Sequence, residues 1–95
     1  MNVDYFKKYI KDVRGVSERT AKHYISALYS INEILTEFHF PYNNLFSISH
    51  TKELEEIQAF LANNEAFHAR DSLGHRMYSV AFKHYCRFFI WYTQH

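Results

Sequence analysis

Seven histidines occur among the 95 residues, and a histidine side chain can bind a metal ion or act as a general base. Helical zinc sites commonly place two histidines four residues apart, because side chains at that spacing share one helix face. No two histidines of this sequence have that spacing, and Cys86 is the single cysteine. We therefore expect scattered surface histidines, with neither a metal ion nor a cofactor.

The sequence also offers few candidates for catalysis. Cys86 lies in an aromatic-rich segment, where a cysteine usually acts as a small buried apolar residue. Glu55 and Glu56 are adjacent carboxylates, but they lie on a charged helix face without a pocket to shift their pKa values. A glycine-rich phosphate loop is absent, since the chain has only two glycines. We expect no catalytic residues and no enzyme activity in this chain.

Charged residues are unevenly distributed, although the net charge is only +1. Residues 7–22 hold six Lys or Arg and two acidic residues, and residues 70–87 hold four basic residues and one acidic residue. Between them, residues 33–65 hold six Glu and one Lys. Such a chain can present one basic and one acidic face. Ordinary solvated helix faces are the alternative interpretation.

The two basic segments contain residues suited to binding a nucleic-acid backbone. Helix N-termini attract phosphate through free backbone N–H groups, and Lys, Arg and hydroxyl side chains bind phosphate oxygens. The DNA-binding candidates are Ser17, Arg19, Thr20, Lys22 and His23 in the first segment and His75, Arg76, Ser79, Lys83 and Arg87 in the second. Helical spacing predicts that the second group shares one face with Ser72. Alternatively, that face is a soluble exterior whose arginine stems cover aromatic rings.

The spacing of apolar residues predicts the elements that position these candidates. Repeats of three and four residues predict helices at about 2–13, 17–37, 51–63 and 72–92. Gly15 is expected to end the first helix, and Ser17 to cap the second. Pro41 and the asparagines after it predict an irregular connection at 39–50. Residues 65–72 are expected to be a linker, or a fifth helix if they form a helical turn of their own.

Composition favours a compact all-α bundle of four or five helices. Aromatic residues make up 19% of the chain, so a short sequence can still build a core. Turns in β-rich folds need Gly and Pro, and only two Gly and one Pro occur. No apolar run approaches the roughly 18 residues of a membrane span, and the N-terminus lacks a signal-peptide pattern. We expect one domain, a cytoplasmic location and no contact with a membrane.

The last predicted helix ends in the apolar run Phe88–Tyr92. Consecutive apolar residues surround a helix on all sides, and one small core cannot bury every side. Exposed aromatic side chains are typical anchors of protein interfaces. We therefore expect Phe89, Trp91 and Tyr92 to contact a protein partner, a catalytic domain or a second copy of the chain. Such an interaction or oligomerisation module is the alternative to DNA binding.

Two stretches resemble a known family. YFKKYIKDVRGVSERTAKHYISALYSINEIL resembles the N-terminal core-binding, SAM-like domain of tyrosine recombinases and phage integrases, whose second helix carries the pattern of Ser17, Thr20, Tyr24 and Leu28. The later stretch MYSVAFKHYCRFF is similar to the aromatic-rich last helix of that domain. Its part from Tyr78 to Phe88 looks closest to the N-terminal DNA-binding domains of some prokaryotic restriction endonucleases.

This resemblance implies a clamp on double-stranded DNA, with the second and last helices near the major groove. Carried over by position, the residues facing the duplex would be Arg19, Lys22, His23, Arg76, Lys83 and Arg87. The Arg, His-x-x-Arg and nucleophilic Tyr of a recombinase catalytic domain have no counterpart at the family's spacing, and no nuclease domain is present. The resemblance thus implies a binding domain that serves a recombinase-like or endonuclease-like protein.

Overall fold

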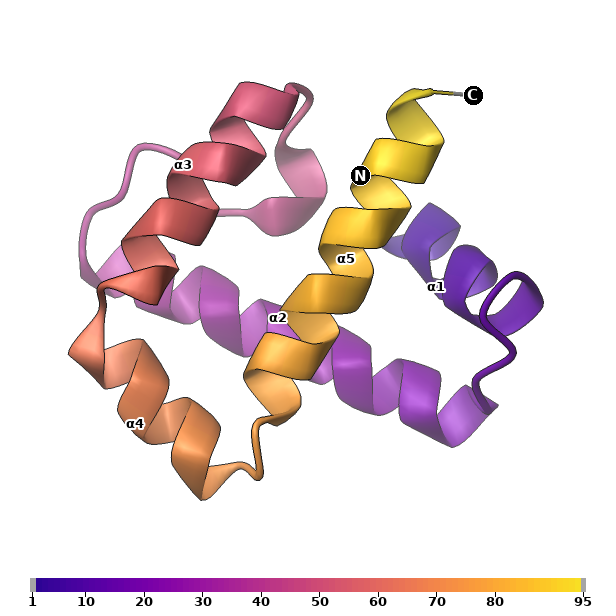
Figure 1. The fold of residues 1–95 in the computed structure, drawn as a ribbon, viewed down its shortest axis with the longest axis horizontal. Helices are drawn as coiled ribbons and strands as arrows, with labels where there is room; N and C mark the ends of the chain where they lie inside the picture. Colours follow the sequence, from indigo (N-terminus) through magenta and orange to yellow (C-terminus); the bar gives the residue numbers. More distant parts are fainter. Residues whose placement is uncertain (1, 95) are drawn as a thin grey trace.

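The computed structural model describes residues 2–94, which form five α-helices and one 3-10 turn, without a strand (Figure 1). This confirms the expected all-α fold. The elements are α1 (Val3–Asp12), α2 (Glu18–Glu37), the turn η1 (Leu45–Ser47), α3 (Thr51–Ala62), α4 (Glu65–Leu73) and α5 (Met77–Thr93).

α1 and α2 form for the reasons predicted from the sequence. α1 buries Phe6, Tyr9 and Ile10, which recur at helical spacing. Gly15 follows it with a φ of +70°, a left-handed conformation that glycine adopts without steric cost. Ser17 then caps α2, because its side chain accepts a hydrogen bond of 3.1 Å from the N–H of Thr20.

The connection between α2 and α3 is anchored in the core. Leu45, Phe46 and Ile48 are all buried. Asn32 of α2 holds η1 in place, because its side-chain oxygen accepts a hydrogen bond of 2.8 Å from the N–H of Leu45. Asn44 accepts a bond of 3.0 Å from the N–H of Phe46. This irregular segment therefore forms part of the bundle.

Residues 65–72 lie in a helix, the second of the two alternatives predicted for this segment, whereas the predicted start of the last helix at residue 72 was wrong. Asn64 accepts a hydrogen bond from the N–H of Phe67 and starts α4, which buries Phe67. The chain turns after Leu73, and α5 begins only at Met77. Asp71 of α4, itself buried, accepts a 2.9 Å bond from the N–H of Ser79 and thereby caps α5 across the turn.

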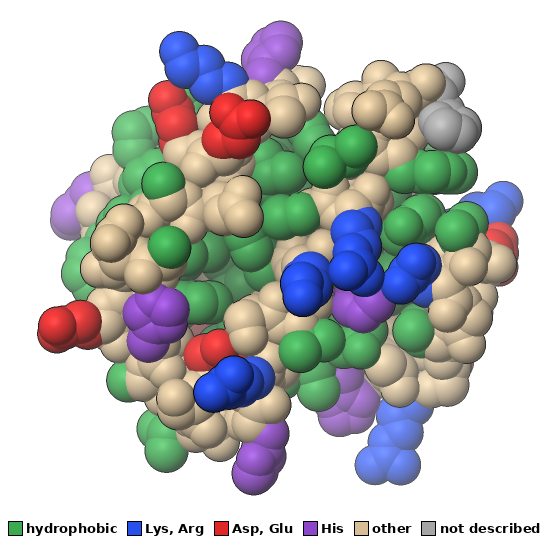
Figure 2. Space-filling view, in the orientation of Figure 1, with side chains coloured by type: hydrophobic (Ala, Val, Ile, Leu, Met, Phe, Trp, Pro, Cys, Tyr) green, Lys and Arg blue, Asp and Glu red, His purple; other side chains and the backbone are tan. Residues whose placement is uncertain are grey.

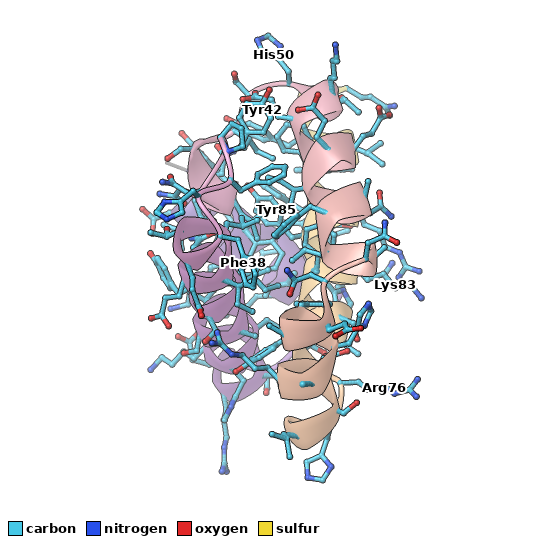
Figure 3. All side chains as sticks on the ribbon, turned by 90° about the vertical axis from the view of Figure 1, so that its left-hand side faces the viewer. Phe38, Tyr42, His50, Arg76, Lys83 and Tyr85 are labelled. Carbon is cyan, nitrogen blue, oxygen red and sulfur yellow. The ribbon has the colours of Figure 1, made fainter. Side chains whose placement is uncertain are left out.

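α5 is the central helix of the molecule. It crosses in front of α2 in Figure 1, and Figure 3 shows α2 on one side of the core with α3 and α4 on the other. Tyr85 of α5 is fully buried, and its hydroxyl donates a 2.5 Å hydrogen bond to the carbonyl of Leu45. Phe6 and Phe88 pack edge-on against each other and around the Tyr85 ring. Aromatic packing of this kind lets a small domain bury a large apolar area.

The resulting body is flat, with principal extents of 33 × 29 × 17 Å. Within residues 2–94, no helix combines the length and the apolar character that crossing a membrane requires. With the core between α2 and α5, the outward face of each helix lies on its own side of the flat body.

Candidate functional site

A group of positive charges lies over α5, around His84. Figure 2 shows Lys and Arg side chains gathered about a histidine near the middle of the molecule. Lys83 and Arg87 flank His84 on α5, and both are exposed. Arg14 reaches the same place from the turn between α1 and α2, close enough to act electrostatically on His84. We call Arg14, Lys83, Arg87 and His84 the α5 basic cluster.

His84 is held against α2 with one ring nitrogen unsatisfied. Its ring stacks on Tyr24, with 4.9 Å between ring centroids and 26° between ring planes. Its Nδ1 is buried without a hydrogen-bond partner, which is true of no other buried side-chain N or O within residues 2–94. Burial lowers the pKa of His84 below 6.5, and the charges of Arg14, Arg87 and Lys83 lower it further. His84 is therefore harder to protonate than a solvated histidine.

No carboxylate neutralises the α5 basic cluster. Among the described residues, Arg14, Lys83 and Arg87 form no ion pair, and no acidic group contributes to the shift of the His84 pKa. Other cations are paired. Lys7 lies 2.7 Å from the Glu18 carboxylate, which Lys11 also contacts. The cluster thus has an excess of positive charge that attracts anions.

The first turn of α2 already holds the groups that satisfy its N-terminus. The Ser17 hydroxyl accepts from the N–H of Thr20 and donates to the Thr20 hydroxyl at 3.0 Å. Glu18 adds a carboxylate, whose pKa is lowered to about 2 by hydrogen bonds from Lys11 and Lys7. The Ser17 and Thr20 hydroxyls and the Thr20 N–H are already engaged with each other, so Ser17 and Thr20 are weaker candidates than their residue types suggested.

The remaining candidates of α2 lie apart from the α5 basic cluster. Arg19, Lys22 and His23 are all exposed. α2 turns its buried side, with Ala21 and Leu28, toward the core and α5, so these three project from the opposite side. Lys83 points away from α2 in Figure 3. The two predicted groups therefore form two separate surfaces.

The second group does not share one helix face, contrary to the prediction. Ser72 belongs to α4, while His75 and Arg76 lie in the turn before α5 with φ values of 55° and 63°. Arg76 is exposed and points outward in Figure 3. Ser79 donates its hydroxyl to the carbonyl of Arg76 at 3.1 Å, which leaves that hydrogen unavailable to a phosphate. Ser79, Lys83 and Arg87 follow one another at four-residue spacing in α5 and share its outward face, so Lys83 and Arg87 are the two cations of this group on that face.

Of the three aromatic residues at the end of α5 that were predicted to contact a partner, two are exposed and Phe89 is buried. Phe89 is only 1% exposed and belongs to the core, so it cannot contact a partner as predicted. Trp91 and Tyr92 are each 38% exposed. Trp91 packs against Tyr9 of α1 with its ring tilted by 42°, at 5.1 Å between ring centroids, and Tyr92 stacks on Tyr5 at 5.4 Å. Consecutive residues were predicted to be exposed together, but the helix turns Phe89 inward.

A groove of about 310 Å³ lies between α1 and the end of α5. It is lined by Tyr5, Lys8, Tyr9, Asp12, Val13, Trp91 and Tyr92. We call it the α1–α5 groove. Tyr5 and Val13 are more than half exposed, at 57% and 54%. Apolar side chains left this open on a small domain are a candidate contact surface.

The residues considered for catalysis and metal binding are not assembled into a site. Within residues 2–94, no three His, Cys, Asp or Glu side chains are grouped closely enough to hold a metal ion. Burial raises the pKa of Cys86 to about 11, so its thiol stays protonated at neutral pH. Cys86 was predicted to be buried, and the structure has it half-buried against the edge of the core. His95 lies outside the described residues.

Arg14 and His84 were not among the predicted site residues. Arg14 was counted among the cations of the basic segment but not as a DNA-binding candidate, and His84 was treated as one of several scattered histidines. They come together because His84 of α5 stacks on Tyr24 of α2, and Arg14 in the turn before α2 lies close enough to act on the His84 ring. A signal was available for Arg14, since it lies inside the basic segment 7–22. Nothing in the sequence indicated that His84 would pack on α2.

Comparisons of this chain with protein-family models, curated proteins and solved structures found no match. The resemblance to core-binding domains therefore stays a prediction, and the residues of the α5 basic cluster must support a function on their own chemistry.

Proposed function

We propose that this chain is a non-catalytic module that binds double-stranded DNA through the α5 basic cluster. The observation that carries this is a group of three cations, Arg14, Lys83 and Arg87, with no carboxylate paired to any of them within residues 2–94. Cations brought together without counter-charges repel one another, and a phosphate backbone removes that repulsion.

The composition of the cluster suits a phosphate backbone. Arg14 and Arg87 offer forked N–H donors that match two phosphate oxygens, and Lys83 adds a mobile point charge. All three lie on exposed positions, so they can reach a rod-like ligand without a change of fold. The resemblance to recombinase and endonuclease binding domains is the reason to choose duplex DNA among polyanions.

The residues on the far side of α2 enter this proposal as a second, independent surface. Arg19, Lys22 and His23 are exposed there, and Arg76 is exposed in the turn before α5. Since α2 and α5 face opposite ways, one straight duplex cannot touch both surfaces at once. A clamp of the recombinase type would need another domain to close around the DNA.

The test compares two matched double variants by fluorescence anisotropy of a labelled duplex at low salt. Lys83→Gln/Arg87→Gln removes two cations of the α5 basic cluster, and Arg19→Gln/Lys22→Gln removes two from the outer face of α2. Glutamine keeps most of each stem, so packing changes little. We expect the first variant to lose at least about tenfold in affinity and the second much less. Equal affinity of the first variant and the parent would refute the assignment.

Self-association through the α1–α5 groove is a second candidate, and the exposure of its aromatic lining favours it. A two-fold dimer brings the same surface of both copies together. Each contact between two different residues therefore occurs twice, once in each direction across the interface. Lys8 and Asp12 line the same groove and carry opposite charges, so each could pair with the other residue in a second copy. A second copy therefore fits both the apolar lining and its charged rim.

Light scattering measures this directly as mass against protein concentration. We expect a rise toward the mass of a dimer, and Trp91→Ser should reduce it. Leu73→Ser is the control, because Leu73 is 84% exposed but lies on α4, away from the groove. A constant monomer mass at all concentrations would exclude this candidate.

A further inference from the structure

His84 is the feature of the α5 basic cluster that phosphate binding alone does not explain. Lys and Arg side chains are sufficient to attract phosphate, so phosphate binding does not require a histidine. The His84 ring nevertheless lies between Tyr24 and three cations. Its Nδ1 is buried without a partner. Protonation would place a hydrogen on a nitrogen that has no acceptor, beside Arg14, Lys83 and Arg87. The free protein therefore disfavours the imidazolium form for two separate reasons.

A bound anion reduces the repulsion between the imidazolium and the three cations, but it does not change the burial of Nδ1. A phosphate on the cluster compensates the charges of Arg14, Lys83 and Arg87, so the repulsion that they exert on an imidazolium falls. The burial of Nδ1 stays as it was. The other groups that face His84 are the phenol of Tyr24 from α2, Arg14 from the turn before α2, and Lys83 and Arg87 on α5. None of them is a carboxylate that could offset the added charge.

We propose that the α5 basic cluster places a phosphate group beside the His84 ring, and that binding of this phosphate is linked to uptake of one proton from solvent by His84. The phosphate is a diester of the DNA backbone or a free phosphorylated small molecule, which share the same oxygen chemistry. Because the proton linkage rests on the proposed DNA binding, its test must distinguish a failure of the linkage from a failure of DNA binding.

The linkage has a definite sign. If the anion favours the protonated ring, the protonated ring equally favours the anion, because the coupling is reciprocal. Affinity for phosphate therefore rises as the pH falls through the titration range of His84. A rise of one in the pKa of His84 on binding corresponds to about a tenfold gain in affinity between a pH above and a pH below both values.

The experiment follows the ring protons of His84 by NMR across a pH titration, without ligand, with inorganic phosphate and with a short DNA duplex. We expect either ligand to raise the pKa of His84, and Arg87→Gln to reduce that rise. This measurement needs no change to His84 itself. In parallel, duplex affinity is measured by anisotropy at neutral and mildly acidic pH for the parent, His84→Gln and His23→Gln. Circular dichroism at both pH values shows whether the helices persist.

The outcomes distinguish the claims. Duplex binding that strengthens at acidic pH in the parent and in His23→Gln, but not in His84→Gln, supports the linkage with DNA as the source of phosphate. A raised His84 pKa with inorganic phosphate but no duplex binding supports the phosphate site and refutes the proposed function. Duplex binding with a His84 pKa that does not move leaves the proposed function standing and overturns the linkage.

Discussion

Ionic strength is the perturbation that tests the α5 basic cluster most directly, because the structure fixes how many cations it offers. Each Lys or Arg that neutralises a DNA phosphate releases condensed counterions, so affinity falls with salt at a log–log slope of about −0.9 per contact. Three unpaired cations, Arg14, Lys83 and Arg87, therefore predict a slope of about −2.7.

This slope converts into a measurable loss of affinity. Raising the salt from about 50 to about 200 mM should weaken duplex binding by roughly 40-fold if three contacts form. If Arg19, Lys22 and Arg76 also contacted the duplex, the slope would approach about −5 and the loss would exceed about a thousandfold. The salt titration thus counts contacts and separates one basic surface from a two-sided grip.

The assay is a series of anisotropy titrations at several salt concentrations, for the parent and two single variants. Arg87→Gln should flatten the slope by about 0.9, because it deletes one contact. Arg70→Gln is the matched control, since the Arg70 guanidinium already lies 3.1 Å from the Glu37 carboxylate. Its removal should leave the slope unchanged.

Two results would refute the reasoning. A slope shallower than about −1 in the parent would mean that the cluster makes at most one phosphate contact. An equal flattening by Arg70→Gln and Arg87→Gln would mean that net charge matters and that the position of the cation does not.

Three further predictions concern the framework that holds the cluster. Tyr85→Phe should lower the free energy of unfolding by about 1–3 kcal/mol in urea titrations, because it leaves the buried carbonyl of Leu45 without its donor; a change near zero would show that water replaces the hydroxyl. Asp71→Ala should cost about 1 kcal/mol by removing the cap of α5, again measured in urea, whereas Asp71→Asn should keep part of it. Glu18 has a pKa lowered from 4.5 to about 2, so its ion pairs with Lys11 and Lys7 stabilise the fold above pH 4.5, and this stabilisation is lost as the pH falls toward 2. The stability difference between the parent and Glu18→Gln should therefore shrink over that range, and a constant difference would contradict the pairing.

Local rules predicted most of the helices. The stripe of Ala21, Leu28 and Ile31 and the cap at Ser17 defined α2 within one residue of its ends, because all these signals lie inside or next to the helix. The break between α4 and α5 was missed for the opposite reason. Asp71 caps a helix that starts six residues later, and no rule about adjacent residues contains that bond.

The candidate site shows the same limit. Lys83 and Arg87 were predicted from helical spacing, and their exposure agrees with it. Arg14 and His84 become neighbours only because α5 crosses α2 at Tyr24. The partition of Phe89 into the core and Trp91 to the surface likewise depends on how α5 is rotated against α1. Spacing along the chain does not determine either arrangement.

The central place of α5 has a consequence for how this protein is made. Tyr85 joins segments far apart in sequence, since its hydroxyl contacts Leu45, 40 residues away, and Asn2, 83 residues away. A ribosome releases α1 to α4 before α5, so the nascent chain lacks the helix against which Phe6 and Tyr9 pack. Its aromatic surface stays open during translation and is a natural target for chaperones that bind apolar segments. The aromatic core is therefore completed only when this last helix docks, and the outward face of the same helix carries the charges proposed to bind DNA.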